Sequence, residues 1–86
     1  MEYIYIGKIV NTHCIKGELR LLSDFEKKDR VFKSGINIFI GKEKQSETIK
    51  TYRHHKQFEM ITLEGYTNIN EVLKYKDQNV MYQDLL

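Results

Sequence analysis

Eighty-six residues are enough for one domain with a single small core, and they leave no room for a separate catalytic domain. Apolar residues make up 41% of the chain and charged residues 30%, which favours a folded globular domain over a disordered segment. The formal net charge of +2 does not by itself indicate a nucleic-acid-binding protein, so a basic patch has to be argued from the positions of its residues.

Composition also limits where the protein works. The sequence has no run of about 18 apolar residues, so we expect no membrane-spanning helix and no membrane contact. Residues 1–4 lack the basic and apolar segments of a signal peptide. The single cysteine, Cys14, cannot form an internal disulfide, which is typical of a reducing compartment. We therefore expect a cytoplasmic protein.

The first two predicted strands form a hairpin. Residues 3–13 are the first strand, and Gly7 within it indicates a bulge or a close approach of another backbone. A turn at 15–17 leads to the second strand, 18–22, with its leucines facing inward and Glu18 and Arg20 outward. Both faces of the first strand are partly apolar, so we expect both to be covered. One face carries Ile4, Ile6 and Val10, and the other carries Tyr3, Tyr5 and Ile9.

The middle of the chain continues the alternating pattern. Residues 24–35 are too charged for a core strand and predict a helical turn or a solvated connector. The polar residues 41–44 and the pair at 56–57 predict turns. Further strands are expected at 36–40, 46–55, 58–64 and 78–82.

A short helix precedes the last strand. Asn68 and Glu71 have the spacing of a capping box, with Asn68 as the N-cap. Ile69, Val72 and Leu73 then have the i, i+3, i+4 spacing of one apolar helix face. Six short strands and one short helix predict an all-β domain, a closed or nearly closed six-stranded β-barrel.

Candidate metal and catalytic residues are few. His54 and His55 are consecutive on a predicted strand and point to opposite faces, so they cannot bind one ion together. The same argument separates His13 from Cys14, and no CxxC or HxxxH spacing occurs. Cys14 beside a histidine is either a nucleophile or a small side chain that fills a turn, and we favour the turn. We expect no metal, no cofactor and no enzymatic activity.

The most informative segment is residues 50–56. Alternation places Arg53 and His55 on one face near a hairpin end, with Lys56 in the turn beside them. Lys16 and Arg20 of the first hairpin would complete a basic rim that can neutralise RNA phosphates. The alternative interpretation is that these charges form an ordinary solvated strand face. The candidate RNA-binding residues are Lys16, Arg20, Arg53, His55 and Lys56.

Three aromatic side chains accompany these cations in the sequence. Tyr5, Tyr52 and Phe58 can act as stacking platforms for nucleic-acid bases. The alternative, which we favour, is packing in the core or against another subunit.

Several motifs together resemble the N-terminal domain of the ribosome maturation factor RimM family. Residues 7–10 and 13–20 are similar to its opening strand and its G-[IL]-x-G-E turn, and residues 23–25 to its T-D segment. Arg53, His55 and Lys56 match its R-x-H-K pattern, residues 63–65 its strand end, and residues 69–76 its short helix. The resemblance covers essentially the whole chain, and its specificity comes from the order and spacing of these motifs. It implies a β-barrel of the translation-factor type.

The chain departs from the family pattern at four positions. Cys14, Gln57 and Asp77 stand where the family usually has glycine, in the first turn, in the hairpin and after the helix. The small alanine of the family helix is missing, and Val72 is the residue we expect to replace it.

The resemblance implies an assembly factor for the small ribosomal subunit that acts by binding, and we expect it to be a monomer. Such a factor assists maturation of the head region and 16S rRNA processing by contacting rRNA and ribosomal protein nineteen of the small subunit. The family carries most of the protein contact on a second, PRC-type barrel. We therefore expect residues 1–82 to be the N-terminal barrel and residues 83–86 to begin a linker. The alternative is a protein-interaction module without direct RNA contact.

Overall fold

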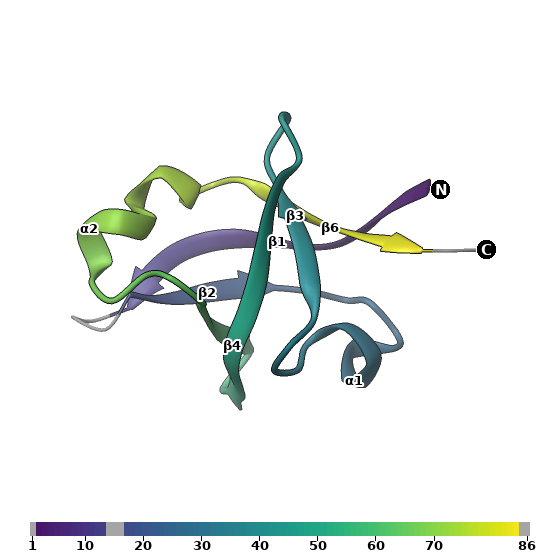
Figure 1. Cartoon of the computed structure of the whole chain (residues 1–86). Helices are drawn as coiled ribbons and strands as arrows, with labels where there is room; N and C mark the ends of the chain where they lie inside the picture. Colours follow the sequence, from purple (N-terminus) through teal and green to yellow (C-terminus); the bar gives the residue numbers. More distant parts are fainter. Residues whose placement is uncertain (1, 14–16, 85–86) are drawn as a thin grey trace.

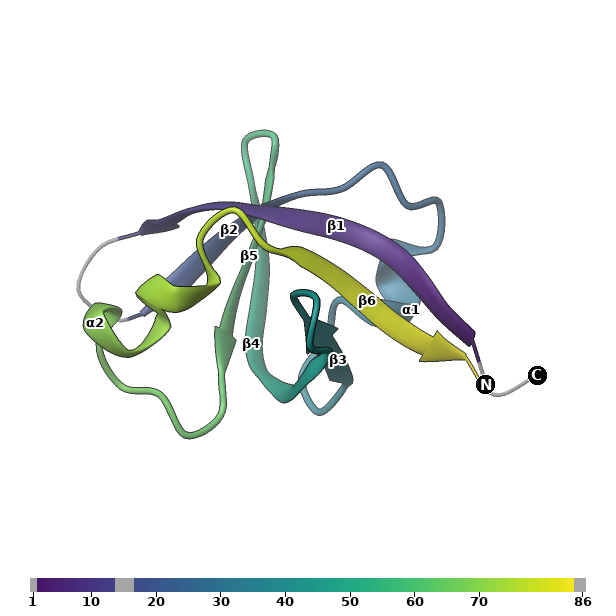
Figure 2. The same cartoon turned by 90° about the horizontal axis from the view of Figure 1, so that it is seen from above.

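Six antiparallel strands form a hydrogen-bonded ring, as the alternating pattern predicts (Figures 1 and 2). The computed structural model describes residues 2–13 and 17–84. The strand order is β1-β2-β5-β4-β3-β6, and β6 returns to pair with β1, which closes the barrel and protects its strand edges. The elements are β1 (Glu2–His13), β2 (Glu18–Leu22), α1 (Lys28–Val31), β3 (Asn37–Ile40), β4 (Gln45–His55), β5 (Phe58–Leu63), α2 (Ile69–Val72), the 3-10 turn η1 (Leu73–Tyr75) and β6 (Asn79–Asp84).

Short helical segments close the two ends of the ring. Figure 1 shows α1 and α2 at opposite ends of the barrel. Val31 and Phe32 are buried at the α1 end, and Val72 and Tyr75 are buried at the α2 end. Each end of the core is therefore covered by apolar side chains. Between them the strands contribute Ile6, Ile9, Leu19, Leu21, Ile38, Ile40, Ile49, Ile61, Leu63 and Val80.

Two bulges in β1 change which of its residues face the core. The pairing register shifts against β6 just before Gly7 and against β2 just after Ile9. The expectation for Gly7 is confirmed, because a Cβ there would lie 2.9 Å from the carbonyl oxygen of Leu22. An inserted residue reverses the alternation, so Ile9 joins Ile6 in the core. Our assignment of Ile9 to the opposite face was wrong for this reason.

The charged segment between β2 and β3 is more than a solvated connector. Its predicted helical turn is present as α1, but Val31 and Phe32 are 2% and 1% exposed. The Phe32 ring stacks on Tyr52 with 6.0 Å between centroids and 17° between planes. This segment therefore supplies part of the core, which its high charge concealed.

The capping box before β6 is confirmed. The Asn68 side chain accepts a hydrogen bond from the backbone of Asn70, and the Glu71 side chain accepts one from the backbone of Asn68. The predicted apolar face holds only in part, because Leu73 is 49% exposed. The chain tightens into a 3-10 turn at Leu73, and this change of pitch brings Tyr75 into the core in its place.

A glycine at position 77 should stabilise the domain. Asp77 has φ 67°, in the left-handed region that glycine occupies without strain. We expect Asp77→Gly to raise the free energy of unfolding by about 0.5 kcal/mol, since the strain relieved slightly exceeds the added entropy of the unfolded chain. The matched control is Lys76→Gly, because Lys76 has φ −59° and glycine gains nothing there. Urea unfolding followed by circular dichroism measures both, and a destabilised Asp77→Gly would contradict the prediction.

The last strand is longer than expected. β6 continues to Asp84, where Gln83 pairs with Tyr3 and Asp84 with Glu2. The start of β1 and the end of β6 therefore form a two-stranded ribbon that extends from the barrel (Figure 2). Residues 83 and 84 belong to this ribbon, whereas we expected the last strand to end at residue 82.

Candidate nucleic-acid interface

Strands β2, β5 and β4 lie side by side and present one outer wall. At its centre Met60 pairs with Arg20 of β2 on one side and with Arg53 of β4 on the other. His55 alternates with Arg53 along β4, and Lys56 follows in the turn to β5. The predicted face shared by Arg53 and His55 is thus present, and Arg20 joins it. We call this wall the basic face; its residues are Arg20, Lys50, Arg53, His55 and Lys56.

Arg20 is held at the hairpin end of the basic face by an aromatic ring. Its guanidinium carbon lies 5.5 Å from the centroid of the Phe58 ring, a cation–π arrangement. The Arg20 Nε is buried and has no hydrogen-bond partner among the described residues. Phe58 pairs with His55 across the β4–β5 hairpin, so a cation, a ring and an imidazole lie together next to Lys56. This corner can offer both a charge and a stacking surface.

Arg53 forms a bidentate salt bridge with the carboxylate of Glu18 on β2. Its Nε and Nη2 donate to the two oxygens of Glu18, at 2.9 Å and 2.8 Å. His13 Nδ1 lies 3.2 Å from the same carboxylate. The hydrogen bond from Arg53 is the main cause that holds the pKa of Glu18 below its ordinary value, with burial opposing it and His13 adding to it. Part of the positive charge of Arg53 is therefore neutralised within the protein.

A hollow of about 540 Å³ lies beside Arg53 on the same wall. Lys50 and Glu18 line it together with threonine hydroxyls. The hydroxyls of Thr51 and Thr62 lie 2.5 Å apart across β4 and β5. Hydroxyls and a lysine are groups that contact sugar and phosphate oxygens, so the hollow extends the polar character of the basic face.

The aromatic residues have three different environments. Tyr52 faces the barrel interior, where it stacks on Phe32 and donates a hydrogen bond of 2.5 Å to Glu59. It packs in the core, as we favoured, and is no stacking platform. Phe58 remains half-buried on the basic face, and Tyr5 is exposed on a different wall. Only Phe58 therefore accompanies the predicted cations.

A buried carboxylate at the α1 end was not foreseen. Glu59 is fully buried, and His54 Nδ1 lies 3.0 Å from both of its oxygens, with Lys28 Nζ at 3.4 Å. Burial opposes its ionisation, but the hydrogen bonds from Tyr52 and His54 and the charge of Lys28 outweigh burial, so the pKa of Glu59 lies below its usual range. Burial and the adjacent carboxylate raise the pKa of Tyr52 to about 12. The cluster is an internal ion pair at the barrel end.

A second buried carboxylate closes the α2 end. Glu47 accepts hydrogen bonds from the hydroxyls of Tyr66 and Tyr75. Burial, followed by the bond to Glu47, raises the pKa of the Tyr75 hydroxyl well above its ordinary value. Lys74 lies over both rings, 5.4 Å and 5.2 Å from their centroids. Alternation could have predicted that both glutamates are buried. Glu47 is two residues from the inward-facing Ile49, and Glu59 is two residues from the inward-facing Ile61.

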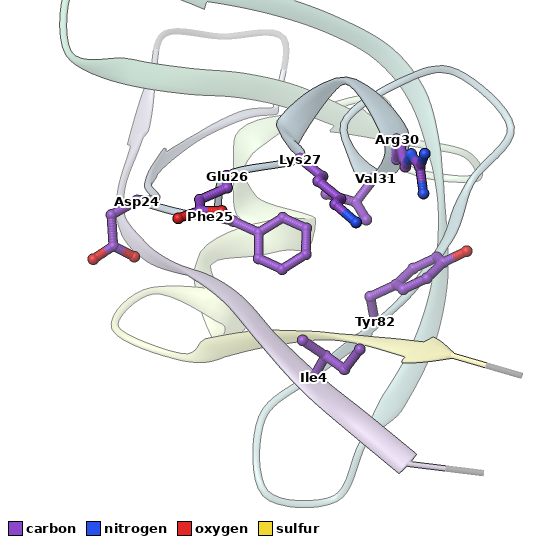
Figure 3. A pocket seen from close by; sticks show the side chains of 8 residues that line it. All are labelled: Ile4, Asp24, Phe25, Glu26, Lys27, Arg30, Val31 and Tyr82. Atoms are coloured by element: carbon purple, nitrogen blue, oxygen red, sulfur yellow. The ribbon is translucent and has the colours of Figure 1, made fainter. Parts of the chain in front are cut away.

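A separate apolar hollow lies between the β1–β6 ribbon and the segment around α1 (Figure 3). It has a volume of about 560 Å³, and its lining contains neither histidine, cysteine nor serine. Its apolar surface comes from Ile4, Phe25, Val31 and Tyr82, and its charged rim comes from Asp24, Glu26, Lys27 and Arg30.

The structure also bears on the metal, membrane and cysteine predictions. Within 2–13 and 17–84, no three histidine, cysteine or acidic side chains are grouped as metal ligands would be. His54 and His55 do face opposite sides, since one binds Glu59 and the other is exposed on the basic face. No helix in this part of the chain is long and apolar enough to cross a membrane. Cys14 and the candidate residue Lys16 lie outside the described residues.

The closed ring of six antiparallel strands defines a small β-barrel domain. A family model described as the RimM N-terminal domain matches residues 4–84. The chain belongs to this family, which confirms the resemblance seen in the motifs.

Relatives and solved structures agree with this assignment. Over 78 residues the chain is 45% identical to the ribosome maturation factor RimM of an Exiguobacterium species, covering 88% of the chain and 45% of the relative. It is 40% identical over 79 residues to RimM of Bacillus thuringiensis, covering 87% and 46%. The chain thus spans about half the length of the curated relatives it matches.

Two solved structures share the fold. The solution structure of the N-terminal domain of RimM from Thermus thermophilus superposes with a TM-score of 0.79 at 14% identity, covering 96% of this chain and 91% of that one. A crystal structure of a Pseudomonas aeruginosa protein described as a 16S ribosomal RNA processing protein RimM gives 0.74 at 16% identity, covering 95% and 51%.

Proposed function

We propose that this domain helps the small ribosomal subunit to mature by binding its precursor, and that the basic face contacts 16S rRNA. The family supports a role in ribosome maturation. The observation that carries the RNA contact is the pairing of β5 with both β2 and β4, which gathers Arg20, Arg53 and His55 on one wall beside Lys56. Clustered cations beside an aromatic ring suit a phosphate backbone with accessible bases.

The proposed mechanism is binding without bond-breaking. A factor that binds a partly folded head region more tightly than its misfolded alternatives shifts the population toward the productive state. Processing of 16S rRNA then proceeds on a correctly folded particle. In this proposal the protein acts as a monomer in the cytoplasm without a cofactor. Ribosomal protein nineteen of the small subunit is the protein partner, bound mainly through a further PRC-type domain.

The cations of the basic face should contribute unequally to RNA binding. We expect Lys56→Ala and Arg20→Ala each to weaken binding to a transcript of the 16S rRNA head domain, and each to reduce the slope of log K against log salt by about 0.7–0.9. Arg53→Ala should reduce the slope less, because Glu18 already neutralises part of the Arg53 charge. Fluorescence anisotropy between about 50 and 200 mM salt, a range chosen from the usual response of such complexes, measures all three.

The matched control is Lys33→Ala, which removes an exposed lysine that follows α1 and is not one of the residues of the basic face. Its affinity and its salt slope should equal those of the unmodified protein. If Lys56→Ala and Arg20→Ala also leave both quantities unchanged, the basic face does not bind RNA.

The alternative function is a protein-interaction module without direct RNA contact. The bidentate pair between Arg53 and Glu18 favours it, because it lowers the net positive charge of the predicted rim. Titration of the head-domain transcript and of isolated ribosomal proteins in separate experiments distinguishes the two functions. Binding to proteins alone would favour the alternative.

A further inference from the structure

Exposed apolar side chains gather on a wall of the barrel that shares only β2 with the basic face. Four large hydrophobic residues are exposed within the described chain, and three of them, Tyr3, Tyr5 and Leu22, are 43%, 48% and 42% exposed on this wall. We expected both faces of the first strand to be covered, and this outer face is open. We call it the aromatic wall; its residues are Tyr3, Tyr5, Leu22, Phe39 and Met81.

Strand pairing makes the aromatic wall continuous. Met81 of β6 pairs with Tyr5 of β1 on one side and with Phe39 of β3 on the other. The rings of Tyr3 and Phe39 meet edge to face with 5.2 Å between centroids. Tyr5 and Leu22 line a shared shallow hollow. The surface therefore extends over β2, β1, β6 and β3. It is a continuous patch and differs from the isolated exposed hydrophobic residues that are common on protein surfaces.

The charges around the aromatic wall are mainly positive. Lys44 Nζ lies 5.4 Å from the centroid of the Tyr3 ring, and the exposed Lys8 pairs with Leu22 across β1 and β2. Within residues 2–13 and 17–84 neither lysine forms an ion pair. One carboxylate, Asp24, lines the hollow with Tyr5. A partner that matches this wall presents an apolar side chain with carboxylates placed to meet Lys44 and Lys8.

We propose that the aromatic wall docks a protein, through a segment with an exposed apolar side chain flanked by carboxylates. Tyrosine, phenylalanine and methionine are enriched at the centres of protein interfaces. Two lysines are few for a phosphate backbone, and Tyr3 already packs its ring against Phe39 and Lys44. The ring order places β1, β6 and β3 across the barrel from β5, so an RNA on the basic face leaves the part of the wall on these three strands open, and Leu22 of β2 borders the basic face.

The test uses purified small-subunit ribosomal proteins, added one at a time to the labelled domain. This choice of probe rests on the proposed function. We expect one of them to bind, and the double variant Tyr3→Ser/Tyr5→Ser to lose at least ~10-fold in affinity, as removal of interface anchors does. The control is Leu73→Ser, which removes an equally exposed apolar side chain near α2 and should bind as the unmodified protein does. Thermal unfolding checks that the variants remain folded.

Charge variants test the second part of the proposal. Lys44→Glu should weaken the same complex, and Lys33→Glu should not. Binding to none of the proteins, or equal binding by the tyrosine variant, overturns the proposal. Tyrosine-dependent binding to the rRNA transcript, or tyrosine-dependent self-association in sedimentation velocity, assigns the wall to RNA or to a second copy and also overturns it. Loss of RNA binding by Lys56→Ala is measured separately, so failure of the basic face and failure of this wall are distinguishable.

Discussion

We expect Phe32→Ala to lower the free energy of unfolding by about 3–5 kcal/mol, because it removes a large core side chain and leaves a cavity. Phe32 is 1% exposed, and its ring stacks on Tyr52 at the α1 end of the barrel. In a domain of this size such a loss lowers the thermal midpoint by more than ~12 °C. Urea unfolding and thermal melts followed by circular dichroism measure both quantities.

The neighbouring Lys33→Ala is the control for Phe32→Ala. Lys33 is exposed and follows Phe32 directly, so its loss should change stability by less than about 0.5 kcal/mol. If both variants unfold at the same denaturant concentration, the segment between β2 and β3 is a solvated connector, as its charge indicates, and Phe32 is not a core residue in solution.

Short-range sequence patterns correctly predicted the inward face of β2 and the start of the helix α2. Alternation identified Leu19 and Leu21 as inward residues, and the spacing of Asn68 and Glu71 identified the helix start. Each of these patterns involves residues that are close in sequence, so it can be recognised without knowledge of the tertiary fold. Phe32 was missed because charged neighbours outweighed one apolar pair in a window of this length.

Local sequence patterns could not predict contacts between strands that are far apart in the sequence. The pair between Arg53 and Glu18 requires β5 to lie between β2 and β4, an order that sequence spacing does not contain. The bulges of β1 reversed its alternation, and Gly7 marked the position of one bulge without giving its effect on Ile9. Of the candidate RNA-binding cations, Arg20, Arg53 and His55 do share one wall. The contact of Arg20 with Phe58 and that of Arg53 with Glu18 could only be seen in the structure.

Glu59→Gln should destabilise the domain at neutral pH and much less at acidic pH. The variant removes the charge from a fully buried carboxylate that Tyr52, His54 and Lys28 surround, and we expect a loss of about 1–3 kcal/mol near neutral pH. The pKa of Glu59 in the folded protein lies below the ordinary glutamate value of 4.5. As pH falls below 4.5, the unfolded chain takes up this proton before the folded one, so the stabilisation is lost as pH falls through the folded pKa.

The difference in unfolding free energy between the unmodified protein and Glu59→Gln should therefore shrink as pH falls below the ordinary glutamate pKa of 4.5 and through the lower folded pKa. Glu18 and Glu71 also have lowered pKa values, so acid destabilises both proteins, and only the difference reports on Glu59. The control Glu26→Gln alters an exposed carboxylate beside α1 and should show no such pH-dependent difference. A difference for Glu59→Gln that stays constant across this range would mean that hydrogen bonding and packing, and not the ionised carboxylate, account for its contribution.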